Sequence, residues 1–438
     1  MRIEYGVDEK PPLIKSWLIG LQWAAVVISS IIILGKVIGE IHFIEPSGLI
    51  IYLQKLLFIN AITLVCQIYW GHRMPVIPGP STVLLIGVIA GQEAGKSAIY
   101  TSVMIGGLFI AVLSASGLFR YLQRLFTLNV VTVVLLLIAF TIAPTVRDLI
   151  VAPKSGISPF YNISFAIIMI ILVFGCYRLL SGIWRSTLII WAMIAGSLIY
   201  FLIFPGGRGD GPACCVTNFG GFFGQMTLDP AIQPGVLISF MFCYIALSIN
   251  DLGSIQSAGE FIAPSGMEGR VKRGVLLTGL ANIASGFFGV IGPVNYSLSP
   301  GMIMSTGCAS RFTLLPAAAI MLFLAFFPDV TGVIGGIPSV VIGAVLAYVM
   351  THQISAGLIV AFKDSKDQGI QFDNGLVIGL PLLLGTVVAF FPGHVVGAMP
   401  QVLRPILGNG FVVGVLSALI LEHVVFRKRI DPGSQGEM

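Results

Sequence analysis

The segment Gly292-Pro-Val-Asn-Tyr-Ser-Leu-Ser-Pro-Gly301 decides how the rest of this sequence is interpreted. It lies between two apolar segments, yet it holds two prolines, two glycines and several hydrogen-bonding side chains. Proline and glycine interrupt helices, and a bilayer tolerates broken backbone only where protein or a water-filled cavity satisfies it. We therefore expect a binding site here, followed by a half-helix whose N-terminal N–H groups face a polar ligand.

The composition is that of a membrane protein. Hydrophobic residues make up 56% of the 438 residues and charged residues only 10%, whereas soluble domains contain about 25% charged residues. A chain of this kind crosses the bilayer many times, and we expect an all-α polytopic fold. The basic residues are scattered singly between apolar segments, so the net positive charge does not indicate a nucleic-acid partner.

Apolar segments close to the roughly 20 residues that a spanning helix needs recur along the whole chain. We count about fourteen of them. Their approximate positions are 17–35, 49–70, 76–90, 97–117, 127–143, 160–178, 186–204, 233–250, 272–290, 295–307, 312–328, 333–359, 374–392 and 402–426.

The third and tenth segments are short and interrupted, and they hold the same place in each half of the chain. The third begins with Arg73-Met-Pro-Val-Ile-Pro-Gly-Pro-Ser81, and the tenth is the segment 292–301. Broken segments at corresponding positions indicate an inverted repeat with its site at the repeat interface. We expect a repeat of seven plus seven spans, with a short extended piece in each broken span.

Basic residues predict the orientation in the membrane. Most of the 24 lysines and arginines fall on the side that carries both termini if the chain has fourteen spans. The positive-inside rule then places both termini in the cytoplasm of a cell-membrane protein. We expect no N-terminal signal peptide, because the first 16 positions mix acidic and basic residues and the apolar segment that follows shows no small-residue cleavage site.

Motifs for other kinds of chemistry are missing from the sequence. It contains no Walker loop, no HExxH and no GxSxG, so we expect neither an enzyme nor a cofactor. The six cysteines form no metal-ligand spacing, and we expect no metal site. Cys214 and Cys215 are adjacent, and we interpret them as two free thiols.

Asp251 is the acidic residue that we expect deepest in the membrane, since it follows the apolar segment 233–250 directly. A carboxylate at membrane depth costs several kcal/mol and is a functional candidate by default. Our hypothesis is that Asp251 carries a proton during transport. The structural alternative is that it caps a broken helix or meets a basic partner. Asn250 beside it would point in a different direction on a helix.

Several motifs, in order along the chain, resemble the nucleobase–ascorbate transporter family, also called xanthine/uracil permeases, and the chain is similar to a divergent member. The motifs are Gly20-Leu-Gln-Trp23, Gly71-His-Arg-Met-Pro75 leading to Gly79-Pro-Ser81, Asn250-Asp-Leu-Gly253, Tyr296-Ser-Leu-Ser-Pro-Gly301, Thr306-Gly-Cys-Ala-Ser-Arg311 and Ile337-Pro-Ser-Val-Val-Ile-Gly343.

This resemblance implies a transport (core) domain that carries the substrate and moves like an elevator against a gate domain, which forms a homodimer interface. The implied regions are a cytoplasmic tail 1–16, core spans 1–4 in 17–117, gate spans 5–7 in 118–204, a non-cytoplasmic linker 205–232, core spans 8–11 in 233–328, gate spans 12–14 in 329–426 and a cytoplasmic tail 427–438.

The sequence departs from the family at the substrate contacts that the resemblance implies. The usual Gln-His of the first span is Gln22-Trp23, the usual glutamate of the eighth span is Asn250, and the usual Glu-Asn pair of the tenth is Leu298-Ser299. Leu298 cannot accept a hydrogen bond from a ring N–H group of a nucleobase. A buried N–H group that is left without a partner costs roughly 1–3 kcal/mol. The substrate-binding residues that we predict are Gln22, Trp23, Ser81, Thr82, Asn250, Tyr296, Ser297, Leu298 and Ser299.

Two functions follow as hypotheses. The first is a secondary active transporter of a nucleobase-like or small organic anionic solute, coupled to a proton or another cation through Asp251. The alternative is an anion exchanger or uniporter on the same fold, whose half-helix N-termini and serine hydroxyls would hold the anion. A membrane-embedded enzyme or sensor has no supporting motif in the sequence.

Overall fold

The computed structural model describes residues 4–43, 46–118, 127–151, 157–181, 184–185, 187–205, 222, 226–227, 229–262, 264–328, 331–332, 336–368, 372–400 and 403–426. Most of the predicted linker 205–232, including Cys214 and Cys215, lies outside the described residues, and so does the predicted tail 427–438.

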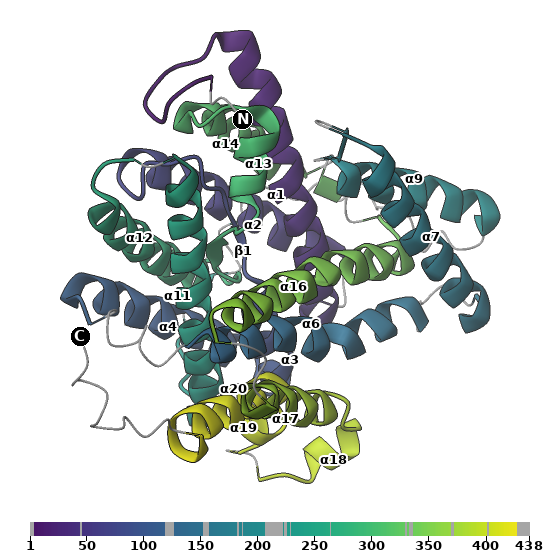
Figure 1. Cartoon of the computed structure of the whole chain (residues 1–438). Coiled ribbons are helices and arrows are strands. Elements are labelled where there is room, and N and C mark those ends of the chain that lie inside the picture. Colours follow the sequence, from purple (N-terminus) through teal and green to yellow (C-terminus); the bar gives the residue numbers. More distant parts are fainter. Residues whose placement is uncertain are drawn as a thin grey trace, which may run out of the picture.

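The described chain is almost entirely helical (Figure 1). The first part contains α1 Leu13–His42, α2 Pro46–Tyr69, β1 Pro78–Pro80, α3 Thr82–Gly91, the 3₁₀ turn η1 Gln92–Ala94, α4 Lys96–Ser116, α6 Leu128–Val151, α7 Pro159–Leu179 and α9 Leu188–Ile203. The second part contains α11 Pro234–Ile262, α12 Met267–Phe287, β2 Pro293–Asn295, α13 Ser299–Thr306, η3 Arg311–Leu314, α14 Leu315–Ala325, α16 Ser339–Gln368, α17 Phe372–Ala389, α18 Gly393–Gly397, α19 Arg404–Leu407, α20 Gly410–Ile420 and the π-helical turn η4 Leu421–Val425.

Eight of the described helices are long and apolar enough to cross a bilayer, and four shorter apolar helices accompany them. The outward surfaces of α7, α9 and α17 carry exposed large apolar side chains such as Phe160, Leu202 and Leu383. In a soluble protein such a surface would be a liability, whereas lipid accepts it. The chain is a multi-pass membrane protein; the count of fourteen spans stays a prediction.

The structural alternative for Asp251, a cap on a broken helix, is wrong. The eighth apolar segment, placed at about 233–250, is not followed by a break in the helix. Instead α11 continues without interruption from Pro234 to Ile262. A polar residue need not end a helix when a partner satisfies its side chain, and Asp251 has such a partner in β2.

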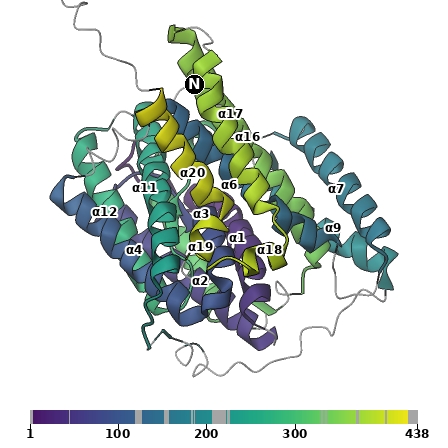
Figure 2. The ribbon, with the colours of Figure 1, turned by 90° about the horizontal axis from the view of Figure 1, so that it is seen from below.

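The helices pack into two groups. One contains α1 to α4 and α11 to α14, with its most extensive contact between α4 and α12; the other contains α6, α7, α9, α16, α17 and α20, with its most extensive contact between α6 and α16. In Figure 2, α4 and α12 lie at one side of the molecule and α7 and α9 at the other. These groups are called the first and second helix groups below. Their roles as transport and gate domains stay a prediction.

Glycines allow the close contact between α4 and α12. A Cβ atom built on Gly107 would lie 2.7 Å from the Ile283 backbone nitrogen, and one on Gly279 would lie 2.7 Å from the Ala111 nitrogen. Real Cβ atoms do not come this close to backbone, so the two helix backbones meet where side chains are missing. Membrane helices use small residues in this way, because lipid provides no hydrophobic driving force between helices.

Candidate functional site: two half-helices behind a pair of short strands

Two three-residue strands lie at the centre of the first helix group. β1 and β2 pair antiparallel, with Pro78 opposite Asn295, Gly79 opposite Val294 and Pro80 opposite Pro293. All six residues are buried. Because a two-stranded pair needs few backbone donors, it accommodates prolines that a central strand would exclude.

Each strand leads directly into a short helix. Ser81 follows β1 and precedes α3, while α13 begins at Ser299 after β2. Two further backbone hydrogen bonds extend the pairing, from Ser81 N to Gly292 O at 3.1 Å and from Tyr296 N to Ile77 O at 3.0 Å. The N-terminal ends of α3 and α13 therefore follow one paired element, and helix N-termini attract acceptor atoms.

Tyr296 covers the strand pair and requires glycine beneath its ring. Its hydroxyl donates to the Pro80 carbonyl at 3.0 Å. A Cβ atom on Gly79 would lie 2.4 Å from Cζ of Tyr296. Gly79 is thus needed for close approach, and Tyr296 closes the junction between the two half-helices.

The two serines at the half-helix starts differ in their bonding. Ser299 Oγ donates to the Tyr296 carbonyl at 2.7 Å and accepts from the Ile77 N–H at 3.2 Å. Ser81 Oγ is fully buried and has no hydrogen-bond partner in the described structure. Ser81 is the N-cap residue of α3, yet its side chain makes no capping bond. A hydroxyl placed like that of Ser81 can bind a ligand.

Asp251 holds β2 against α11. Its Oδ1 atom accepts from the Asn295 backbone N–H at 2.8 Å and from Asn295 Nδ2 at 2.9 Å. The side chain is 0% exposed, and its Oδ2 atom is without a partner among the described residues. Asp251 therefore reaches the strand that positions α13, while one carboxylate oxygen remains available for a proton.

Polar residues of α2 and α12 support β2 from behind. Gln67 Nε2 donates to Gly274 O at 2.9 Å and Thr278 Oγ1 at 3.2 Å. Asn282 Nδ2 donates to Pro293 O at 2.9 Å, and Asn282 Oδ1 accepts from Tyr244 OH at 2.9 Å. The sequence analysis did not identify the role of Asn295, although Asn295 lies within the segment 292–301.

The other predicted residues come from the helices around this element. Trp23 in α1 is fully buried, and its Nε1 atom has no partner in the part of the chain that the structure describes. Gln22 beside it is also buried. Asn250 and Thr82 are half-buried, whereas Ser297 is exposed.

The contacts of these helices converge on the strand pair. α1 contacts β1 and α3, while α11 contacts β2, α3 and α13. Leu298, at the start of α13, is 41% exposed, and neither Gly301 nor Gly253 has a neighbour within 4 Å of a built Cβ atom. Leu298 and these two glycines therefore leave open space next to the half-helix. No group of three or more metal-ligating His, Cys, Asp or Glu residues occurs among the described residues.

Many apolar spanning helices around two central half-helices define a membrane transporter. The model of the xanthine/uracil permease family, described as a permease family, matches residues 14–394. The chain belongs to this family. The expectation that it is a transporter rather than an enzyme is thereby confirmed.

The relatives include proteins named as a nucleobase transporter and a uric acid transporter. The nucleobase transporter PlUacP of Paenibacillus larvae is 26% identical over 377 residues, covering 83% of this chain and 83% of that protein. The uric acid transporter UacT of Escherichia coli is 21% identical over 423 residues, covering 93% of this chain and 85% of that protein. The low identities agree with a divergent member.

The fold also resembles that of a solved anion transporter. The transmembrane domain of BicA, a bicarbonate transporter from a cyanobacterium, superposes with a TM-score of 0.60 at 16% identity, covering 86% of this chain and 95% of that chain. At this identity the likeness concerns the fold alone.

Proposed function

We propose that this protein is a secondary active transporter of a nucleobase-like solute, which binds beside the paired strands between the starts of α3 and α13. The observation that carries the proposal is the buried hydroxyl of Ser81, which stands between β1 and α3 and has no hydrogen-bond partner among the described residues. Trp23 Nε1, on the helix α1 that contacts β1 and α3, is likewise buried and unpartnered. A buried polar atom without a partner costs about 1–3 kcal/mol. A bound solute with acceptor atoms would remove that cost.

The type of hydrogen bond favours a solute rich in acceptors. Trp23 can only donate, Ser81 can donate or accept, and the half-helix N-termini donate. Among the predicted contacts, only Gln22 and Asn250 offer amide carbonyls as acceptors, and both also carry an NH₂ donor. Ring carbonyls or deprotonated ring nitrogens fit these donors better than ring N–H groups do, so we propose an oxidised purine or a related weak acid as the substrate class.

Asp251 is proposed to couple transport to protons. Its charged form is held by two donors from Asn295, while Oδ2 is left buried without one. A proton on Oδ2 would remove the cost of this unpaired charge. Because Asn295 belongs to β2, a change of charge at Asp251 alters the strand that leads to the half-helix α13.

The proton hypothesis is tested by uptake into proteoliposomes at different external pH values. Uptake by the wild type is expected to rise as the external side becomes more acidic, because protonated Asp251 would load the carrier. Asp251→Asn keeps an acceptor for the Asn295 N–H but carries no titratable charge, so its uptake is expected to lose the pH dependence. Full pH dependence in the variant would rule out the role of Asp251.

The remaining features of the proposal follow the family resemblance. The first helix group would move as an elevator against the second, which would form a homodimer interface, and both termini would lie in the cytoplasm. An anion exchanger or uniporter is the second candidate, because the site lacks the family's two carboxylates. Binding of xanthine, uracil and uric acid compared with sulfate and bicarbonate, measured by thermal shift of the purified protein, separates the two.

A further inference from the structure

The N-terminal residues 4–9 lie along the segment that leaves α13. Tyr5 and Cys308 form a parallel β-bridge. Three backbone hydrogen bonds extend it, from Glu4 N to Gly307 O at 2.9 Å, from Ala309 N to Tyr5 O at 3.0 Å and from Arg311 N to Val7 O at 3.1 Å. Residues 4–9, called the strap below, thus pair with residues 307–311, which follow the far end of the half-helix.

Side chains reinforce this pairing on both sides of the strap. Arg311 Nη2 pairs with Asp8 Oδ1 at 2.8 Å, and Lys15 Nζ pairs with Glu4 Oε2 at 2.6 Å. Lys15 also lies over the Tyr5 ring. The Asp8 and Glu4 side chains are more than half exposed, and exposed ion pairs contribute only about 0–1 kcal/mol. The backbone hydrogen bonds therefore contribute most of the stability of the contact between the strap and residues 307–311.

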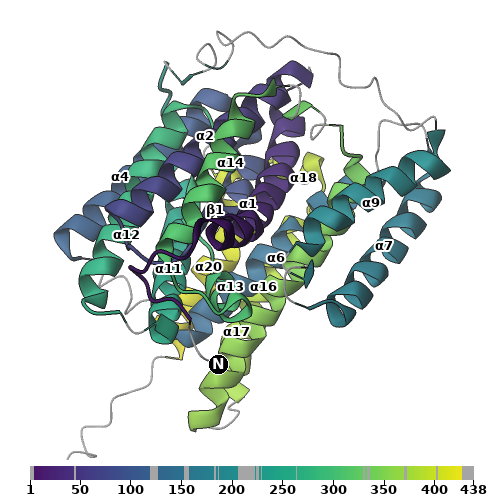
Figure 3. The ribbon, with the colours of Figure 1, turned by 90° about the horizontal axis from the view of Figure 1, so that it is seen from above.

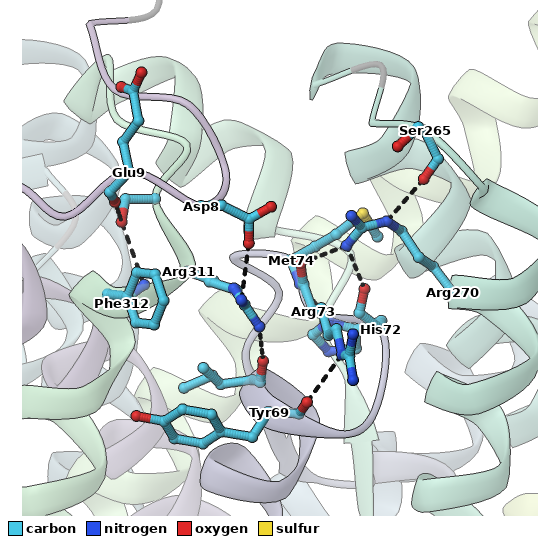
Figure 4. Close-up of polar contacts among 12 residues, drawn as sticks. Asp8, Glu9, Tyr69, His72, Arg73, Met74, Ser265, Arg270, Arg311 and Phe312 are labelled. Atoms are coloured by element: carbon cyan, nitrogen blue, oxygen red, sulfur yellow. Dashed lines mark hydrogen bonds and ion pairs between the residues drawn. The ribbon is translucent and has the colours of Figure 1, made fainter.

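Arg311 connects the strap to the rest of the first helix group. Its Nη1 atom donates to the Ile68 carbonyl in the last turn of α2, where the helix dipole favours a cation. Figure 4 shows Arg311 between Asp8 and the end of α2, with Arg270 nearby donating to the backbone of the loop that follows α2. In Figure 3 the purple N-terminal segment lies beside α1 at this end of the molecule.

The strap matters because α13 is short. Eight residues rise only about 12 Å, so the two ends of α13 lie about two turns apart. Tyr296 and Ser299 fix the end at the site. At the other end of α13 the chain leaves the helix at Gly307, which adopts a left-handed conformation with φ of 64°. From Gly307 onward the chain pairs with the strap.

We propose that the strap is a positioning element of the binding site: it stays paired with residues 307–311 and thereby fixes where the half-helix α13 begins. Asp8, Tyr5 and Arg311 act through α13 and do not touch the solute. The effect on transport rests on the proposed function, whereas the pairing and the position of α13 do not.

The pairing is tested with the cysteine that the protein already has. Neighbouring strands lie about 4.8 Å apart, within the Cα separation that a disulfide spans, so Tyr5→Cys is expected to form a disulfide with Cys308 under mild oxidation, mapped by mass spectrometry. Gly6→Cys is the matched control, because its side chain points to the opposite face of the strand and should cross-link at least tenfold more slowly. Equal rates, or no cross-link in Tyr5→Cys, would overturn the proposal.

The position of α13 is read from a cysteine at its start. Leu298→Cys offers an exposed thiol for maleimide labelling, and deletion of residues 2–9 is expected to change its labelling rate at least fivefold. Asp8→Asn, which removes one exposed ion pair and keeps the backbone bonds, should change it less than twofold. An unchanged rate after the deletion, in protein that still elutes as a folded species, would contradict the positioning role.

Transport supplies the third readout, with uptake of radiolabelled uric acid as the probe. The Tyr5→Cys protein is expected to keep its uptake within twofold when oxidised, and the deletion should raise KM more than it lowers the maximal rate. Uptake blocked by oxidation and restored by reduction would show that the strap must detach, which overturns the proposal. If no nucleobase is transported at all, the proposed function fails, while the cross-linking and labelling results still decide the role of the strap.

Discussion

Ser81 and Ser299 occupy matching positions at the starts of the two half-helices, yet only the Ser299 hydroxyl forms hydrogen bonds within the described protein. Its hydroxyl joins the Tyr296 carbonyl to the Ile77 N–H. Ser81 Oγ, equally buried, has no partner in the described chain. The sequence analysis predicted both residues as substrate contacts. In the structure the Ser299 hydroxyl bonds to the backbone at the strand junction, whereas the Ser81 hydroxyl is free to bind a ligand.

This difference predicts opposite outcomes for the same substitution. Ser81→Ala removes a group without a protein partner, so the melting temperature should not fall, while the affinity for the solute should drop about 2- to 10-fold through loss of one neutral hydrogen bond. Ser299→Ala breaks two bonds to backbone and should lower the melting temperature. Thermal melts and equilibrium binding of the same preparations distinguish the two. A destabilised Ser81→Ala protein with unchanged affinity would contradict this assignment.

Gly79 provides a second test at the residue scale. Gly79→Ala places a Cβ atom against the Tyr296 ring, so the hydroxyl of Tyr296 should lose the Pro80 carbonyl, and uptake should fall at least tenfold. Gly375→Ala in α17, away from the site, is the matched control, because no atom lies within 4 Å of a Cβ atom at this position. Comparable uptake by the two variants would show that the contact between Tyr296 and Gly79 is unimportant.

At this scale the sequence predicts the break in the backbone at residues 292–301 better than the side-chain contacts around it. The prolines and glycines of residues 292–301 mark a broken backbone in an apolar chain, and the strand β2 lies there. The bond between Asp251 and Asn295 joins residues 44 positions apart, and no local pattern specifies such a pair. Since the directions of the Trp23 and Ser81 side chains depend on packing, the sequence could suggest these residues but could not show that they lack partners.

At the scale of elements, apolar length predicts the helices, while their ends depend on tertiary contacts. The predicted segment 233–250 is the start of α11, which continues for another 12 residues. Two of these added residues are Asp251 and Gly253, and sequence rules treat a buried charge and a glycine as reasons to end a helix. Asn295 pairs with the charge, and a single glycine costs a helix only about 1 kcal/mol relative to alanine, which is too little to end α11 at Gly253.

The contact between α4 and α12 gives a prediction about stability. Gly279→Ala puts a Cβ atom 2.7 Å from the Ala111 nitrogen and 2.8 Å from the Gly107 carbonyl oxygen, so the two helices must separate, and the melting temperature in detergent should fall by several degrees. Gly269→Ala on the same helix has its nearest neighbour at 3.9 Å. That variant should be neutral or slightly stabilised, because alanine favours the helix. Equal melting temperatures would contradict the close packing.

At the scale of the whole molecule, polar contacts connect the first helix group to the start of α19, which contacts α20, and to the start of α20 itself. Arg404 of α19 pairs with Glu93, which follows α3, and Asn409, the N-cap of α20, donates to Ser239 of α11 at 2.9 Å. If the groups move against each other, these contacts must break and re-form in each cycle.

Glu93→Gln should therefore change the rate of transport rather than the affinity for the solute. The Glu93 side chain is 59% exposed, so the ion pair contributes only about 0–1 kcal/mol and its loss should raise the turnover up to about fivefold. Asp148→Asn, which removes an exposed ion pair within α6, serves as the control. A change in KM at constant maximal rate would show that the pair does not lie on the path of movement.

The central claim is that a nucleobase-like solute binds at the paired strands between α3 and α13. It is tested most directly by uptake of radiolabelled uric acid, xanthine and uracil into proteoliposomes with an inward proton gradient, comparing the wild type with Ser81→Ala. The account predicts uptake of at least one of them, with a KM about 2- to 10-fold higher in the variant. Uptake of sulfate or bicarbonate without any nucleobase, or an unchanged KM in Ser81→Ala, would contradict it.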